Sequence, residues 1–258
     1  MKNTFRKEVT EGLERTNKLK LEILKESDIH HLPVAVQKYI LYTGSIGKNK
    51  VLNFRVEFKG RIRSKPGDDF MKLTSVQYNF MDYPTRIFYI TAKKKGVPVK
   101  GIHVYKNFKA KMIIKILGLF TVVDAKGKEM DQGETVTVFN DMCFMAPATL
   151  IDRNIEWKEV DEKTVEAKFT NGGITIKATL LFNDKGELVN FISKDRCETI
   201  DGKTYYNYPW HTPVISYMDI NGYRLPSGAR LIYEHTDGKF CYGEFELENI
   251  EYNCKQLK

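Results

Sequence analysis

Apolar and polar residues alternate along most of this chain beyond residue 50. In residues 52–58, for example, the apolar side chains fall on one side of an extended backbone and the polar side chains on the other. Similar segments occur at residues 71–80, 85–92, 99–108, 165–170, 174–182, 188–196, 229–235 and 240–252. One buried and one polar face per strand is typical of antiparallel sheets. The pattern therefore predicts a large antiparallel sheet.

Turn signals divide these segments into hairpins. Asn171-Gly172-Gly173 separates two of them, and Asx-Gly pairs follow at residues 201–202, 221–222 and 237–238. Such sequences favour tight turns because Gly and Asn tolerate positive φ. We expect a meander that ends in a long hairpin over residues 229–252. Residues 112–119 fit either a short amphipathic helix or a buried strand, because so short an apolar run has no decisive period.

Three segments have a helical pattern instead. Residues 5–26 predict a polar surface helix with a thin apolar stripe. Residues 33–43 predict a short helix, with Pro33 in its first turn and Gly44 just past its end.

The third helical segment, residues 134–151, is predicted to be the centre of the fold. Val136, Phe139, Asn140 and Cys143 follow one another at i, i+3, i+4 and i+7, so they share one helix face. Pro147 ends this helix and opens a second short one. Asp131 is the predicted N-cap, with the carboxylate of Glu134 three residues later.

These elements predict an α+β fold. We expect a strongly curved antiparallel sheet of about ten strands, an open half-barrel wrapped around the helices of residues 33–43 and 134–151. Residues 1–30 form an N-terminal polar helical region, and residues 31–258 form a single half-barrel domain. A half-barrel too wide for its own side chains leaves a hollow beside the helices.

The net charge of +8 narrows the choice of partners only partly. The excess is mostly lysine, dense at residues 93–95 and 106–115. Such patches fit ordinary solvation, contact with anionic lipid headgroups at a membrane surface, or another acidic partner. Zinc-finger spacing, RNP-type aromatic motifs and a helix-turn-helix pair are absent from the sequence, so nucleic acid is not an expected partner. The pattern does not indicate an oligomeric state.

The expected location is the cytoplasm. The N-terminus is charged throughout and lacks the apolar core of a signal peptide, and no run approaches the ~20 apolar residues that cross a bilayer. The four cysteines have no CxxC spacing and read as separate reduced thiols.

The sequence also lacks the usual catalytic and cofactor motifs. P-loop, GxGxxG, HExxH, GxSxG and EF-hand patterns are all missing, so we expect no cofactor, no metal site and no defined catalytic residue. His30 and His31 are adjacent and would point about 100° apart in a helix, which suits a helix entry better than a metal pair.

Polar residues on the central helix are the first candidates for a site. Asn140 lies on its apolar face, where its amide would satisfy backbone groups of a strand or contact a ligand. Glu134 and Asp141 are seven residues apart on one side of the helix, and they would be solvated or serve acid–base chemistry.

Two later segments add further candidates. Arg196 ends a predicted strand, and its guanidinium would pair internally with Glu134 or Asp141 or bind a ligand carboxylate or phosphate. Residues 205–214 place three tyrosines beside Trp210 and His211, between two prolines. This aromatic loop would either plug one end of the barrel or line a pocket.

Four stretches also carry a family resemblance. They are LPVAVQKYILYTGSIG, GLFTVVDAKGKEMDQGETVTVFNDMCFMAPATLIDRNIEW, LFNDKGELVNFISKDR and YPWHTPVISYMDINGYRLPSGARLIYEHTDGKFCYGEFELENIEYN. Through them the chain resembles a bacterial family of uncharacterised function over roughly residues 32–253. The order of elements is also similar to the half-barrels of the lipoprotein-carrier type, in which an incompletely closed sheet wraps around helices and holds acyl chains. That similarity implies a hydrophobic ligand.

The leading hypothesis is a non-enzymatic binder or carrier of a lipid-like or other hydrophobic ligand on the concave side of the sheet. The residues expected at this site are Glu134, Phe139, Asn140, Asp141, Met142, Met145, Trp157, Arg196, Trp210 and His211. Two alternatives stay open. One is an enzyme that uses Glu134 or Asp141 with His211, and the other is a protein-interaction scaffold.

Overall fold

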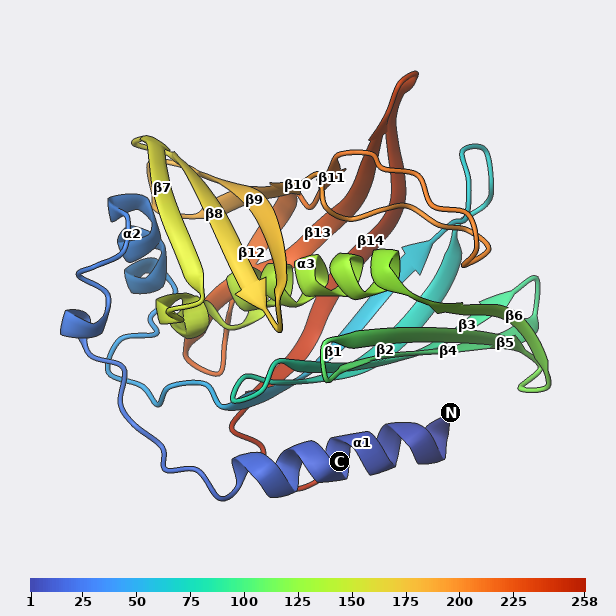
Figure 1. The fold of residues 1–258 in the computed structure, drawn as a ribbon, viewed down its shortest axis with the longest axis horizontal. Helices are drawn as coiled ribbons and strands as arrows, with labels where there is room; N and C mark the ends of the chain where they lie inside the picture. Colours follow the sequence, from blue (N-terminus) through green and yellow to red (C-terminus); the bar gives the residue numbers. More distant parts are fainter.

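A computed structural model describes residues 1–258, and its main element is one open antiparallel sheet of 14 strands. The strands are β1 (Asn53–Ile62), β2 (Met71–Phe80), β3 (Thr85–Lys94), β4 (Val97–Lys106), β5 (Lys109–Ile116), β6 (Phe120–Lys126), β7 (Ile155–Asp161), β8 (Thr164–Asn171), β9 (Ile174–Phe182), β10 (Leu188–Ser193), β11 (Trp210–His211), β12 (Val214–Ile220), β13 (Tyr223–His235) and β14 (Gly238–Tyr252). Their order is β6-β5-β4-β3-β2-β1-β14-β13-β11-β10-β9-β8-β7, and β12 pairs with β13 (Figure 1). The predicted fold class is confirmed, although the strands outnumber the ten expected.

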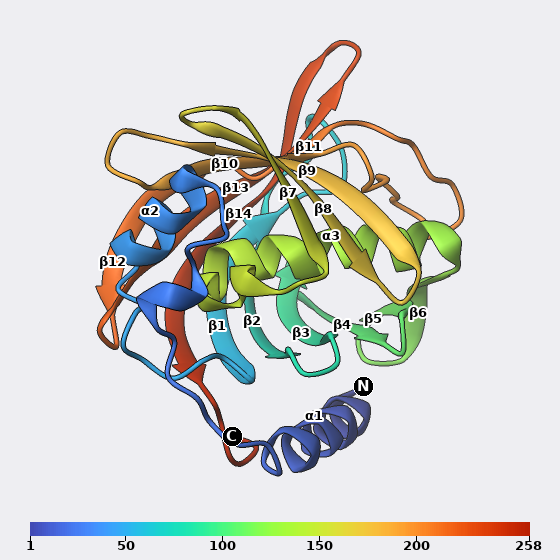
Figure 2. The ribbon, with the colours of Figure 1, turned by 60° about the vertical axis from the view of Figure 1, so that its left-hand side comes forward.

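Pairing of β1 with β14 joins the two halves of the meander. Phe54 lies opposite Tyr252 in this register, so the first and last strands meet at the middle of the sheet. The free edges are β6 and β7. The long helix α3 (Lys128–Met145) connects these edges and lies on the concave side (Figures 1 and 2).

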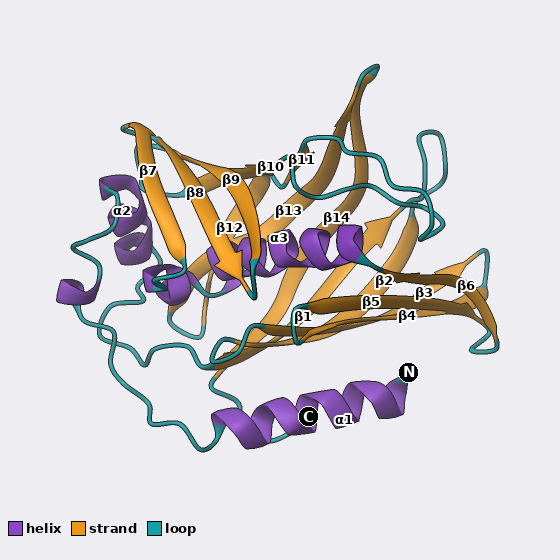
Figure 3. Ribbon diagram, viewed as in Figure 1, coloured by secondary structure: helices purple, strands orange, loops and turns teal.

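Helix α1 (Lys2–Thr16) covers the convex face instead, on the opposite side of the sheet from α3 (Figure 3). Phe5, Val9 and Leu13 pack there with Tyr78 and Phe80 of β2. Their spacing of four residues makes a continuous stripe on one side of the helix. The predicted helix over residues 5–26 was wrong in its second half. The chain beyond residue 20 is extended, and Ile23 bridges to Asn49 while Leu24 enters the main core.

Helix α2 (Val34–Tyr42) follows a short 3₁₀ turn (Glu26–Asp28) and confirms the predicted helix over residues 33–43. Gly44 has φ +66, a left-handed conformation that favours glycine just past a helix end. The Tyr39 hydroxyl donates a hydrogen bond of 2.7 Å to the backbone oxygen of Cys143, so α2 is tied to the end of α3.

Helix α3 begins earlier than the sequence predicted. Gly127, not Asp131, precedes its first turn, and the carboxylate of Asp131 accepts hydrogen bonds from the backbone N–H of Ala110 and the ammonium of Lys109. The predicted N-cap is therefore wrong, because the carboxylate joins the helix to β5 instead. Pro147 opens a 3₁₀ helix (Pro147–Ile151), so the second helix of the pair has a tighter form than expected.

The ambiguous residues 112–119 belong mostly to β5, which pairs with β4 and β6. A core of 40 buried residues fills the space between α2, α3 and the strands β7–β10, β13 and β14, and it also includes residues of β1, β4, β5 and β6. No helix of the protein is both long and apolar enough to cross a membrane.

Candidate functional site

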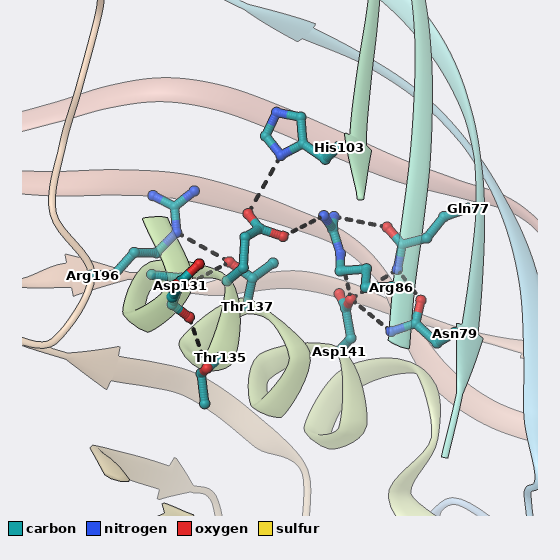
Figure 4. A network of polar contacts seen from close by, with 11 residues as sticks. Gln77, Asn79, Arg86, His103, Asp131, Thr135, Thr137, Asp141 and Arg196 are labelled. Carbon is teal, nitrogen blue, oxygen red and sulfur yellow. Dashed lines mark hydrogen bonds and ion pairs between the residues drawn. The ribbon is translucent and has the colours of Figure 1, made fainter. Parts of the chain in front are cut away.

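A buried network of charged and amide side chains joins α3 to the concave face of β2, β3 and β4. We call it the polar network (Figure 4), and its members are Gln77, Asn79, Arg86, His103, Glu134 and Asp141. Residues of a strand share a face when they are two apart, so Gln77 and Asn79 of β2 both point to α3. Tyr78 and Phe80 point to α1 on the other face.

Arg86 is the centre of the polar network. Its Nη1 donates to Oε2 of Glu134 at 3.1 Å, its Nε donates to Oδ2 of Asp141 at 2.8 Å, and its Nη2 donates to Oε1 of Gln77 at 2.9 Å. The fork of a guanidinium can make such parallel charge-assisted bonds, which a lysine could not reproduce. One cation on β3 therefore holds two carboxylates that lie two turns apart on α3.

The two carboxylates respond differently to this shared cation. Burial by itself would raise the pKa of Glu134, but Arg86, His103 and Arg196 together lower it to about 2. Burial also acts on Asp141, where it outweighs the attraction of Arg86 and raises the pKa above its usual value. Glu134 is thus held as an anion, whereas Asp141 is the easier of the two to protonate.

These contacts decide between the interpretations left open for Glu134 and Asp141. Neither carboxylate is solvated, since their side chains are 5% and 13% exposed. Neither is hydrogen-bonded to His211, whose Nε2 instead lies 2.8 Å from Oε2 of Glu234. The structure therefore shows no direct hydrogen bond between His211 and either carboxylate.

Arg196 lies beside the polar network but does not form the predicted ion pair with Glu134 or Asp141. Its Nε donates to Oγ1 of Thr137 at 3.3 Å, and its Nη1 donates to the Tyr233 hydroxyl. Its guanidinium carbon lies 4.5 Å from the ring centre of Trp210, a cation–π contact. The predicted pairing was wrong because Arg86 occupies the place next to both carboxylates. Arg86 lies in a predicted strand, but it was not among the predicted site residues.

Asn140 has a different partner from either one expected. Its amide donates to Oγ1 of Thr212 at 2.8 Å, so it satisfies a side chain beyond β11 rather than strand backbone. Trp210 donates its indole N–H to the Tyr242 hydroxyl at 3.0 Å and is 2% exposed. Trp210 therefore belongs to the core, whereas Tyr206 of the same loop is 53% exposed.

The predicted apolar wall is packed rather than hollow. The ring of Phe139 contacts the rings of Trp157, Phe169 and Phe191 at centroid distances of 5.3 to 6.3 Å. Met142 and Met145 are also buried in the main core. A cavity of about 470 Å³ lies elsewhere, between α2 and β12, and none of the ten predicted residues lines it.

Apolar side chains continue along the concave face beyond the polar network. We call this set the concave strip, and it consists of Ile62, Met71, Leu73, Ile90, Ala92, Val99, Ile114, Ile116 and Phe245. They form a separate hydrophobic cluster that contains no residue of α3, although Ile114 also packs against the main core, and six of them remain partly exposed. Strand parity places the strip on the same face as Gln77, Arg86 and His103.

The sequence carries only a weak signal for the strand residues of the polar network. Gln77, Asn79, Arg86 and His103 each stand next to apolar residues of their strands, as expected for the polar face of a half-buried strand. In a sheet with one solvated face such residues point to water. Here α1 covers the apolar face and α3 covers the polar one, so both faces are buried at this place.

No cluster of three or more His, Cys, Asp or Glu side chains has the geometry to hold a metal ion.

The comparisons with known proteins agree with the family resemblance. The family described as "Family of unknown function (DUF6544)" matches residues 22–245, and the chain belongs to this family. No curated protein matches the chain. A DUF1329 family protein from Desulfovibrio piger is similar in structure, with 11% identity, a TM-score of 0.47, and coverage of 78% of this chain and 86% of the other. A putative outer membrane lipoprotein-sorting protein domain from Vibrio parahaemolyticus has 6% identity, a TM-score of 0.46, and coverage of 78% and 85%.

Proposed function

We propose that this protein is a non-catalytic binder of a lipid-like hydrophobic ligand, and that the ligand lies on the concave strip. The observation that carries the proposal is the partial exposure of six apolar side chains on the concave face of an otherwise well-filled fold. Scattered apolar residues on a surface need no explanation, but a contiguous apolar face inside a curved sheet is typical of a binding surface.

The strip differs from the site expected from the sequence. Phe139 packs on Phe169 of β8 and Phe191 of β10, and that half of the sheet is filled by its own side chains. The strip lies on the other half, along the ends of β2, β3, β4 and β5 that are distant from the polar network. An acyl chain would run along these strand ends.

The energy available on the strip is sufficient for useful affinity. Covering ~300 Å² of acyl surface at ~25 cal/mol per Å² would contribute ~7 kcal/mol before the cost of ordering the ligand. Ser75 lies on the same face between Gln77 and Leu73, and its buried hydroxyl has no hydrogen-bond partner in the protein.

His103 and Arg196, on the side of the polar network, would receive a polar headgroup. His103 is two residues from Gly101 and adjoins the strip, and its side chain is 20% exposed. Arg196 has five N–H donors and uses two hydrogen bonds to Thr137 and Tyr233, so donors remain for an anionic oxygen. We expect an anionic or strongly polar headgroup at this end.

Native mass spectrometry of the purified protein, followed by organic extraction, tests whether a ligand is present. Lipid-stripped protein is then titrated with a fluorescent fatty acid. We expect saturable binding that Ile90→Asn and Ile116→Asn each weaken by about tenfold or more, since each removes apolar contact from the strip.

Ile215→Asn is the matched control, because Ile215 is 55% exposed on β12 and lies outside the strip. It should leave the affinity unchanged. A clean apo mass together with no saturable binding by the stripped protein would exclude the proposal. Equal losses in all three variants would place the ligand elsewhere.

A further inference from the structure

Two hairpin turns lie next to each other at one end of the sheet. The turn between β3 and β4 and the turn between β5 and β6 are joined by a hydrogen bond of 2.9 Å from the backbone N–H of Leu117 to the oxygen of Pro98. Val99 and Ile116 are paired in the register just behind it. We call residues 93–98 and 115–122 the hairpin lip.

The hairpin lip exposes more large apolar side chains than any other part of the surface. Leu119 is 75% exposed and Phe120 is 64% exposed. The others are Leu117, Val122 and Val97. A soluble surface rarely gathers so many apolar side chains without a partner.

The backbone of the second turn is also unusual for its sequence. Leu117 and Gly118 both have positive φ, +55 and +72, as the central residues of a tight hairpin turn require. Asn, Asp or Gly is favoured at the first of these positions, and a leucine there has a conformational cost. A leucine that is both strained and 54% exposed gains nothing within the protein, so its benefit lies in an outside contact.

Unpaired lysines surround these apolar side chains. There is no Asp or Glu between Thr85 and Val123. Lys109 and Lys111 on β5 have aspartate partners, Asp131 and Asp124. The lip itself and the strand next to it carry lysines that form no ion pair, namely Lys93, Lys94, Lys95, Lys100 and Lys115.

The faces of the lip differ in their side chains: Lys93, Lys100 and Lys115 lie on the convex face, whereas Lys94 is paired with Val97 and lies with it on the concave face. Ile116 is paired with Val99 and Phe120, and these three share the concave face with the strip. Lys115 is paired with Lys100 on the convex face. The lip is therefore amphipathic, and its apolar side is continuous with the concave strip through Val99 and Ile116.

We propose that the hairpin lip docks this protein on the surface of an anionic phospholipid bilayer. Leu117, Leu119 and Phe120 enter the boundary between headgroups and acyl chains, and the lysines lie over the anionic headgroups. Proteins bind such surfaces through leucine and aromatic side chains combined with basic residues. The apolar side chains insert below the headgroups, and the lysines are attracted to the anionic headgroups. The contact does not require a ligand on the concave strip, although it would place the open end of the strip at the lipid.

Co-sedimentation with vesicles tests this interaction. We expect the wild-type protein to bind phosphatidylcholine–phosphatidylglycerol vesicles mixed at about three to one, to bind phosphatidylcholine vesicles weakly, and to lose binding as salt is added. Lys94→Gln with Lys95→Gln should lower the partition coefficient about 25-fold, from about fivefold per lysine. Leu119→Ser with Phe120→Ser should lower it at least tenfold.

Matched controls use residues far from the lip. Lys18→Gln with Lys20→Gln removes two exposed lysines beyond α1, and Val160→Ser removes an apolar side chain that is 52% exposed on β7. Both should bind like wild type. Because all substituted side chains are exposed, circular dichroism and thermal unfolding should not change.

Three results would overturn the proposal. The first is no binding of the wild type to anionic vesicles at low salt. The second is full binding by the Leu119/Phe120 variant, which would leave only nonspecific attraction by lysines. The third is a wild-type dimer in light scattering that this variant dissolves, which would make a second copy of the chain, paired along the free edge β6, the partner of the lip. Failure of fatty-acid binding on the concave strip would leave the vesicle result intact.

Discussion

Replacing Glu134 by glutamine tests the electrostatics of the polar network most directly. The substitution keeps the size and hydrogen-bonding shape of the side chain but removes the negative charge that Arg86 contacts at 3.1 Å. The glutamine of the variant resembles a permanently protonated glutamate. Arg86 then retains only Asp141, whose own pKa is raised. We expect Glu134→Gln to destabilise the fold at neutral pH.

The size of the expected loss in folding free energy follows from the difference in the pKa of Glu134 between the folded and the unfolded protein. Glu134 has a pKa of about 2 in the fold and 4.5 as a model value. A folded pKa below the unfolded one gives stability that is present above the unfolded value and is lost as the pH falls through the folded one. The difference corresponds to about 3 kcal/mol at pH 7 and about 1 kcal/mol at about pH 3, on the scale of ~1.36 kcal/mol per pKa unit.

Urea unfolding of wild type and variant across this pH range measures the effect. The wild type should be more stable than Glu134→Gln by about 3 kcal/mol at pH 7, and the gap should narrow as the pH falls below about 5. Asp141→Asn is the matched comparison. Because the pKa of Asp141 is raised, its charged form costs stability above the model value of 3.8, so this variant should be at least as stable as wild type at pH 7.

Two results would refute the reasoning. A gap for Glu134→Gln that does not change between about pH 7 and pH 3 would mean that the loss comes from packing rather than from charge. A large loss in Asp141→Asn at neutral pH, with little loss in Glu134→Gln, would mean that the two carboxylates have been assigned the wrong way round.

Further predictions concern the core and α1. Phe139→Ala should destabilise the protein by about 3–5 kcal/mol and lower the midpoint of thermal unfolding by about 6–15 °C, because the side chain is fully buried among three aromatic rings. A loss below about 1 kcal/mol would show that Phe139 borders empty space after all. Gly12→Val should detach α1, since even a Cβ at this position would lie 2.4 Å from the ring of Phe80. Trypsin should then cleave faster at Lys18 and Lys20 than in wild type or in a Glu14→Val control at an exposed site of the same helix.

The sheet could be predicted because its signal is local. Two-residue alternation and Asx-Gly turns identified most strands and the terminal hairpin over residues 229–252, whose first strand in the structure begins earlier, at Tyr223. The strand count was low because β11 has only two residues and because β6, β7 and β12 lie at the border of the sheet with few buried side chains. Such strands are held by backbone pairing, which leaves little trace in the pattern of side chains.

The polar network could not be predicted because its members are far apart in the sequence. Glu134 and Asp141 were recognised on α3, but Arg86 and His103 became their partners only through the packing of α3 on β3 and β4. The hollow expected beside Phe139 was wrong for a related reason. The period of a helix says which residues face inward, and it does not say whether aromatic rings from other strands fill the space.

The two sides of α3 contact the sheet through different kinds of side chains. One side packs against β9 and β10 through an apolar core, and the other side meets β2, β3 and β4 through charges. A buried ion pair seldom stabilises a fold more than apolar residues of similar size would, so stability alone is a poor reason for this arrangement. Charge does fix position, because Arg86 can satisfy two carboxylates only in one register of α3. An apolar face at this place would let α3 slide along the sheet and cover Ile90 and Ile114. The network therefore keeps the helix in one place and leaves the strip uncovered, which is the arrangement that a binding surface needs.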